Sequence, residues 1–241
     1  MNNATGFIDI HSHLLPGVDH GADTMEEALG ILFDAAQAGV RKLALTPHVA
    51  GDTAPDLIET MVRQFNSLKE LVRQSGVNIE LHMGAELMLH PELLSRLQGD
   101  RRLTINGKGK YALVEMPVFS KPIFADTVFF DLLARGFVPI WAHPERCVDV
   151  MEDYTTLIRH KENGVLLQIN AGSLAELYGR RTAKTVKKMI EKGLVHMVAS
   201  DTHHRHDKGV ALRDAYRSVV KIVGDCRADE IFFANPSKVL E

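Results

Sequence analysis

FIDIHSH, residues 7–13, sets the pattern for the whole chain: a short apolar run leads directly into a His-x-His pair. Side chains alternate along an extended strand, so His11 and His13 should point to the same side of it. Such a pair can chelate a metal ion, although a single pair is a weak signal. The ends of the other predicted strands decide whether it belongs to a larger site.

Short apolar runs alternate with longer amphipathic stretches along the whole chain, which is typical of strand–helix units that build a parallel sheet. We predict seven strands, at residues 7–10, 42–46, 78–83, 111–115, 138–142, 165–169 and 195–200. We predict helices at residues 24–38, 56–74, 126–135, 155–163, 182–192 and 210–223. Thr24 and Glu27 have the spacing of a capping box. Without a repeat or linker, the pattern favours one α/β domain over residues 1–241, barrel-like or doubly wound.

The composition excludes several classes of protein. The net charge of -3 gives no electrostatic basis for nucleic-acid binding. The N-terminus lacks the features of a signal peptide, and no apolar run approaches the ~20 residues needed to span a bilayer. The two cysteines, Cys147 and Cys226, form no Cys-x-x-Cys pair, and we expect both to be small buried residues. A cytoplasmic protein is therefore expected.

Metal-ligand side chains follow six of the seven predicted strands. Beyond the first pair they are His48 in TPH, Glu86 in GAE, Glu115, His143 in AHPER, and Asp201 and His203 in SDTH. Active sites of parallel α/β barrels lie at the carboxyl ends of the strands, where the loops converge. We therefore expect these side chains to form one site.

Imidazole and carboxylate ligands together suit divalent zinc, manganese or iron, and no cysteine is needed. The number of candidate ligands is enough for two or three ions. Ions held about 3.5 to 4 Å apart can share a hydroxide and clamp a phosphoryl group during attack. The sequence therefore predicts a metal-dependent hydrolase of phosphoesters or related substrates.

Several stretches, taken in order, resemble the polymerase and histidinol phosphatase (PHP) superfamily, and more closely the bacterial manganese-dependent protein tyrosine phosphatases of capsule and exopolysaccharide operons. They are FIDIHSHLLPGVDHGADTMEEAL, TPH, GAE, YALVEMP, AHPER, LQINAGSL, GLVHMVASDTHH and NPSKVL. The resemblance implies a distorted seven-stranded (β/α) barrel and a phosphatase with two or three divalent ions, most readily manganese. It also implies a phosphotyrosine-bearing protein as substrate, such as the tail of a bacterial tyrosine kinase.

The resemblance assigns ligands to three ions. The first ion would be held by His11, His13, Glu86 and Asp201; the second by Glu86, Glu115 and His143; the third by His20, His48 and His203. Relatives usually have Asp-Asp-Gly where this chain has Asp19, His20 and Gly21. We keep His20 as the ligand, with Asp19 as the alternative.

Arg146 matches an arginine that the resemblance places near the substrate phosphate. A guanidinium fork can bind two phosphate oxygens at once, although a surface salt bridge with Glu145 or Glu152 would also explain this residue. The stretch 204–209 departs from relatives that carry an Arg-Pro segment, so Arg205 and Lys208 are alternative phosphate contacts.

Other functions stay open at this point. One is a phosphatase of the same superfamily that acts on histidinol phosphate, a nucleotide or a sugar phosphate. Another is a metal-stabilised binding protein without catalysis. A cysteine-based phosphatase is disfavoured, because Asp153 and Phe232 stand where the arginine six residues after each cysteine would be required. We expect structural roles for the four histidines that lack ligand spacing, His82, His90, His160 and His196.

Overall fold

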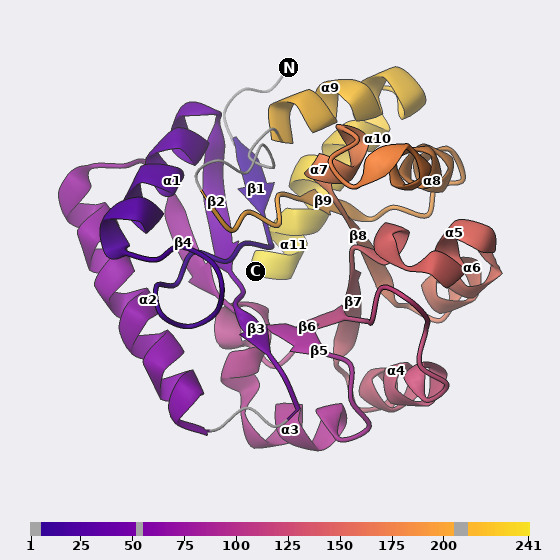
Figure 1. The fold of residues 1–241 in the computed structure, drawn as a ribbon, viewed down its shortest axis with the longest axis horizontal. Coiled ribbons are helices and arrows are strands. Elements are labelled where there is room, and N and C mark those ends of the chain that lie inside the picture. Colours follow the sequence, from indigo (N-terminus) through magenta and orange to yellow (C-terminus); the bar gives the residue numbers. More distant parts are fainter. Residues whose placement is uncertain (1–5, 52–54, 205–211) are drawn as a thin grey trace.

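The computed structural model describes residues 6–51, 55–204 and 212–241. The strands in these ranges gather at the centre of the molecule, and the helices surround them (Figure 1). The strands are β1 (Phe7–Asp9), β2 (Val40–Leu45), β3 (His48–Val49), β4 (Glu80–Met83), β5 (Glu86–Met88), β6 (Tyr111–Glu115), β7 (Val138–Ala142), β8 (Leu166–Asn170) and β9 (Met197–Ala199). The α/β fold predicted from the alternating pattern is confirmed.

Two parallel sheets contain these strands, in the orders β1-β2-β4 and β3-β5-β6-β7-β8-β9. The described residues therefore hold nine strands rather than the seven predicted. The two additional strands, β3 and β5, come shortly after the predicted strands 42–46 and 78–83, and Pro47 and Gly84 lie in the short breaks before them. Proline offers no N–H to a strand ladder. A Cβ atom on Gly84 would lie 2.8 Å from Cδ1 and 3.2 Å from Cα of Ile105, so a larger residue would require Ile105 to shift.

The helices are α1 (Met25–Gln37), α2 (Pro55–Ser75), α3 (Leu93–Gly99), α4 (Ala125–Ala134), α5 (Val148–Glu152), α6 (Thr155–Glu162), α7 (Ala171–Leu174), α8 (Gly179–Glu191), α9 (Leu212–Val223), α10 (Asp225–Asp229) and α11 (Asn235–Leu240). All six predicted helices are present with small shifts at their ends, and residues 210 and 211 of the last lie outside the described ranges. The Thr24 hydroxyl accepts a hydrogen bond from the Glu27 N–H, as a capping box requires. The Glu27 carboxylate, however, accepts from the Asp23 N–H instead of that of Thr24.

Apolar side chains fill the space among the strands as well as the space beneath the helices. A cluster among the strands takes residues from β1, β2, β6, β7 and β9, among them Ile8, Ala44, Leu113, Ile140 and Met197. Val239 and Leu240 of α11 pack into the same cluster. Full burial of each of the larger side chains, such as isoleucine, leucine or methionine, contributes about 1.5–3 kcal/mol. This packing holds the strands together, while polar residues that follow them form the site.

Two further expectations concern the surface. Within the described ranges, none of the helices combines the length and apolar character needed to cross a bilayer. Cys147 is buried as predicted, whereas Cys226 is exposed, so that prediction is wrong. The short helix α10 turns Ala228 towards the core instead, which leaves Cys226 on its outer side.

Candidate metal centre

His11 and His13 lie directly after β1 and are fully buried. Their Nε2 atoms are 3.1 Å apart. The other ring nitrogen of each is held by a neighbouring side chain: His11 Nδ1 lies 2.9 Å from Gln168 Oε1, and His13 Nδ1 lies 2.7 Å from Asp19 Oδ2. An acceptor at Nδ1 fixes the tautomer whose Nε2 is available to a metal ion. The predicted pair is therefore arranged for chelation.

The carboxylate of Glu86, at the start of β5, lies among imidazole nitrogens. Its Oε1 atom is 2.8 Å from His143 Nε2. Its Oε2 atom is 3.0 Å from His48 Nδ1, 3.2 Å from His11 Nε2 and 3.3 Å from His13 Nε2. Within the described part of the chain, no group meets this buried Oε2 in hydrogen-bonding geometry. A buried carboxylate oxygen without such a partner is costly unless a cation compensates it, so the donor set fits a divalent metal ion.

Asp201 and His203 follow β9 and lie next to the His11 and His13 side chains. Asp201 Oδ1 lies 3.4 Å from Nε2 of both His11 and His13. Its other oxygen, Oδ2, accepts a hydrogen bond of 2.6 Å from the Asn170 side chain. The His203 ring stacks on the His13 ring with centroids 4.1 Å apart. The two predicted residues are thus brought to the His-x-His pair.

Glu115 and His143 add a further carboxylate and a further imidazole to the site. Glu115 ends β6, and its Oε2 lies 3.6 Å from His48 Nδ1. Its Oε1 lies 3.9 Å from His143 Nε2. His143 follows β7 and has a left-handed backbone with φ 33°. This conformation is uncommon for a residue with a Cβ atom, and it turns the chain into the 3-10 segment Pro144–Arg146.

Asp19 and His20 take different positions. The Asp19 carboxylate contacts His13 Nδ1 and also accepts a hydrogen bond of 3.0 Å from the His48 N–H. The His20 ring stacks with the rings of His48 and His203, at centroid distances of 5.0 and 4.7 Å. Asp19 therefore orients other site residues, whereas His20 lies beside the histidines with which it was grouped.

Four groups of three side chains place their ligand atoms within 4.8 Å of one another. They are His11, His13 and Asp201; His11, Glu86 and His143; His48, Glu86 and Glu115; and His13, His48 and His203. Among the described residues, every predicted ligand except His20 belongs to at least one of these groups. The grouping differs in part from the one that the resemblance implies, because His48 also approaches the two glutamates.

A buried polar network that the sequence did not predict supports the ligands. Gln168 donates a hydrogen bond of 2.9 Å to Asn170. Glu145 accepts hydrogen bonds from the Asn170 N–H at 2.8 Å and from the Ser173 hydroxyl at 2.7 Å. Gln168 and Asn170 stand two residues apart in β8, the one predicted strand without a ligand. Two polar residues at this spacing at the end of an apolar strand were the signal that could have revealed them.

The charges of the site favour the binding of cations. Burial by itself lowers the pKa of His11, but the carboxylates of Glu86 and Asp201 outweigh it and raise the pKa to about 9. Burial would raise the pKa of Glu86 and of Asp201, yet the neighbouring histidines, His11 first among them, hold both pKa values well below the usual range. The carboxylates therefore stay ionised at neutral pH and attract positive charge.

Arg146 lies at the edge of the metal centre. Its Nη1 is 3.6 Å from Asp201 Oδ2, and its guanidinium carbon is 4.7 Å from the centre of the Tyr178 ring. The alternative salt bridges are not what the structure shows: Glu145 is buried in the network above, and Glu152 pairs with another arginine at 3.2 Å. Arg146 is thus positioned beside the candidate ligands.

The remaining histidines lie elsewhere in the fold. His196 Nδ1 accepts a hydrogen bond of 2.9 Å from the Leu167 N–H. His160 is buried, and its ring packs edge-on against Phe129 and Trp141. Neither residue, nor His82 or His90, belongs to a group of candidate ligands within the described ranges.

The stretch 204–209 lies outside the described residues from Arg205 onward. His204 is described, and its Nδ1 lies 3.8 Å from Glu27 Oε1. Phosphate contacts from Arg205 or Lys208 stay predictions.

Imidazoles and carboxylates lie together at the carboxyl ends of parallel strands. This arrangement is typical of a class of proteins, the α/β metal-dependent hydrolases. Within that class, the chain belongs to the family described as "Capsular polysaccharide synthesis, CpsB/CapC", whose family model matches residues 7–241.

Named relatives agree with this family. The tyrosine-protein phosphatase YwqE of Bacillus subtilis (strain 168) is 31% identical over 222 residues, which are 90% of this chain and 85% of the relative. The tyrosine-protein phosphatase CpsB of Streptococcus pneumoniae is 28% identical over 239 residues, 97% of this chain and 98% of the relative. The solved structure described as YwqE from B. subtilis and CpsB from S. pneumoniae, "unique metal-dependent tyrosine phosphatases", matches with a TM-score of 0.89 and 27% identity over 97% of this chain and 94% of that one. The resemblance inferred from the motifs is confirmed.

Proposed function

We propose that this protein is a metal-dependent phosphatase that hydrolyses phosphotyrosine in proteins. Its family and the names of its relatives support this substrate. The observation that carries the proposal is the environment of Glu86, where a buried carboxylate oxygen faces three imidazole nitrogens at 3.0 to 3.3 Å. This arrangement suits divalent ions, and divalent ions suit phosphoester hydrolysis.

Nine side chains would hold two or three ions, with manganese as the expected metal and iron or zinc as the alternatives. They are His11, His13, His20, His48, Glu86, Glu115, His143, Asp201 and His203. The mixed imidazole and carboxylate donors favour such borderline and hard ions. The two oxygens of Glu86 lie near different imidazoles, Oε1 near His143 and Oε2 near His48, so Glu86 would be a ligand of more than one ion.

The chemistry that bound divalent ions supply is a lowered pKa for water and neutralisation of charge on the phosphoryl oxygens. The chain's own residues position the reactants. Gln168 and Asp19 hold His11 and His13 in orientation, and the Arg146 guanidinium would bind two phosphate oxygens. Because a tyrosine phenol has a pKa near 10, it leaves more readily than an alkoxide, so the reaction needs only a modest general acid and no phosphoenzyme.

The proposed physiological substrate is the phosphorylated tail of a bacterial tyrosine kinase that regulates capsular or exopolysaccharide synthesis. The family description supports the pathway. The cytoplasmic location stays a prediction.

We also propose that the two sheets form a distorted seven-stranded (β/α) barrel in one domain over residues 1–241, with β2 and β3 counted as one strand and β4 and β5 as another. Backbone hydrogen bonds beyond the ends of β1 and β9 support this proposal. The His13 N–H donates to the Thr202 carbonyl at 2.8 Å, and the Asp201 N–H donates to the His11 carbonyl at 3.0 Å.

Turnover of a phosphotyrosyl peptide, histidinol phosphate, a nucleotide and a sugar phosphate, measured side by side, tests the function. We expect the peptide to be the preferred substrate, a chelator to abolish activity and manganese to restore it. His11→Ala should be inactive, whereas His90→Ala, a matched control at an exposed histidine, should keep its activity. Activity that survives both metal removal and His11→Ala would reject the proposal. Failure to hydrolyse any aryl phosphate with manganese bound would instead favour a binding protein.

A further inference from the structure

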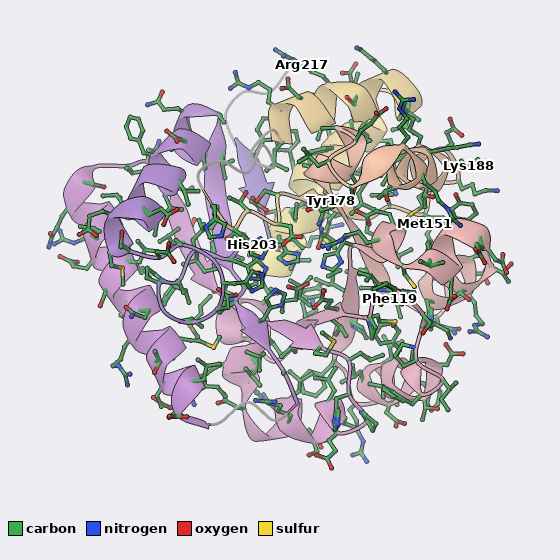
Figure 2. All side chains as sticks on the ribbon, in the orientation of Figure 1. Phe119, Met151, Tyr178, Lys188, His203 and Arg217 are labelled. Carbon is green, nitrogen blue, oxygen red and sulfur yellow. The ribbon has the colours of Figure 1, made fainter. Side chains whose placement is uncertain are left out.

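Tyr178 extends the metal centre towards the surface. Its ring lies 4.7 Å from the guanidinium carbon of Arg146, and Arg146 in turn lies 3.6 Å from Asp201. Tyr178 and His203 both fall within the central region of Figure 2, where the strands converge. Tyr178, Arg146 and Asp201 thus form a continuous series of contacts from the surface to the candidate ligands.

The backbone fixes the position of Tyr178. It occupies the N-cap of α8, and its carbonyl accepts a hydrogen bond of 3.0 Å from the Thr182 hydroxyl. The preceding residue, Leu177, donates its N–H to the Gly172 carbonyl at 3.1 Å. A Cβ atom on Gly172 would lie 2.8 Å from Leu177 Cδ1 and 3.5 Å from Tyr178 Cε2, so the glycine allows this turn to pack against α7.

The Tyr178 ring offers an uncharged apolar surface. The residue is 39% exposed, although Arg146 covers one face of the ring and the hydroxyl interacts with the Asn170 side chain. Burial and then the charge of Asp201 raise the pKa of its phenol above the usual value, so the side chain is neutral under ordinary conditions.

We propose that Tyr178 is a specificity-determining residue that contacts the aromatic ring of the substrate while Arg146 contacts its phosphate. This inference rests on the proposed function. In an aryl phosphate only the ester oxygen separates the ring from phosphorus, so a side chain packed on the phosphate-binding guanidinium is near enough to meet the ring. A serine or sugar phosphate offers no ring there. A contact between aromatic rings strengthens binding by about threefold to tenfold beyond the area that it buries.

Calorimetric binding of two phosphonates to the metal-loaded protein tests the inference. Benzylphosphonate carries a ring beside its phosphorus, and methylphosphonate does not. Tyr178→Ala should weaken benzylphosphonate binding by about tenfold and leave methylphosphonate binding close to that of the unmodified protein. Tyr178→Phe, which keeps the ring and loses the hydroxyl, should retain the preference. Leu177→Ala is the matched control, since it removes an exposed apolar side chain from the same turn.

Equal losses for both phosphonates would overturn the inference, because Tyr178 would then act only by holding Arg146. An unchanged preference in Tyr178→Ala, or the loss of it in Tyr178→Phe, would overturn it as well. Methylphosphonate binding reports whether the variant site is folded, and Tyr178→Leu makes the same test if the alanine variant does not fold. The proposed function is judged separately: it fails if the unmodified protein does not hydrolyse a phosphotyrosyl peptide, whatever the phosphonates show.

Discussion

Asp19 and His13 are joined by a contact of 2.7 Å between a carboxylate oxygen and Nδ1 of the imidazole. The same oxygen accepts the His48 N–H at 3.0 Å. Burial would raise the pKa of Asp19, but the contact with His13 lowers it to about 2, so the carboxylate is ionised. One charged side chain therefore orients two candidate ligands. Asp19 itself belongs to none of the four groups of ligand atoms found in the described part of the chain.

Asp19→Asn keeps the size of this side chain and removes its charge. We expect the metal affinity to fall by about 10- to 100-fold, as is typical when the partner of a histidine ligand is replaced. Competition with a chelator of known affinity measures the effect. Asp23→Asn, in the same loop and exposed, is the control. An affinity equal to that of the control would show that Asp19 does not orient His13 for metal binding.

His20→Ala tests the assignment of the third ion. The stacking of His20 with His48 and His203 places its ring beside two other imidazoles. We expect the variant to retain about one metal equivalent fewer than the unmodified protein after dialysis, because a site with fewer donors binds more weakly. Elemental analysis by mass spectrometry gives the count, with His90→Ala as the control. Unchanged metal content in His20→Ala would remove it from the ligand set.

Arg146→Ala should lower kcat/KM for a phosphotyrosyl peptide by about 10- to 100-fold, since hydrogen bonds to a charged group contribute about 1.5–3 kcal/mol. Arg146→Lys should restore only part of the loss, because an ammonium group cannot bind two oxygens as a fork. Steady-state kinetics measure both variants. Arg181→Ala, at an exposed arginine paired with Glu152, should behave like the unmodified enzyme. If Arg146→Ala does so too, Arg146 does not bind the phosphate.

The lowered pKa of the His160 imidazole predicts that the folded protein loses stability in acid. Burial is the main cause that lowers its pKa from the usual 6.5 to about 4 in the folded protein. Between these values the unfolded chain binds more protons than the folded one, so the free energy of unfolding falls as pH drops from about 6.5 to about 4, by on the order of 3 kcal/mol. Urea unfolding at pH 7 and pH 4.5 should therefore show a smaller pH dependence for His160→Gln than for His90→Gln. Equal pH dependence in the two variants would contradict the prediction.

Local patterns predicted the uninterrupted strands well. The runs 111–115 and 138–142 are apolar and isolated, and β6 and β7 have the same bounds. By contrast, β3 and β5 contain two and three residues, too few for an alternating pattern to be visible. Their pairing depends on neighbours distant in the sequence, such as the Glu86 N–H that donates to the Pro47 carbonyl at 3.0 Å.

Every candidate ligand except His20, which only the resemblance indicated, follows a strand or ends it, and parallel strands bring such positions to one edge. Glu145 and Tyr178 were not predictable in this way. Glu145 was considered only as a surface partner of Arg146, since nothing local indicates that it is buried against Asn170. Tyr178 stands between two helices in the sequence and not at a strand end, and the packing of α7 against α8 brings it to the site.

The left-handed backbone of His143 and Asp201, with φ of 33° and 55°, sets two requirements at each position. The backbone favours glycine, asparagine and aspartate, whereas metal binding demands an imidazole or a carboxylate. Few amino acids meet both requirements, so a saturation library should find these positions among the least tolerant in the chain. Glycine and asparagine at position 201 should yield folded protein without activity. In these variants the amount of folded protein would be kept while catalysis is lost.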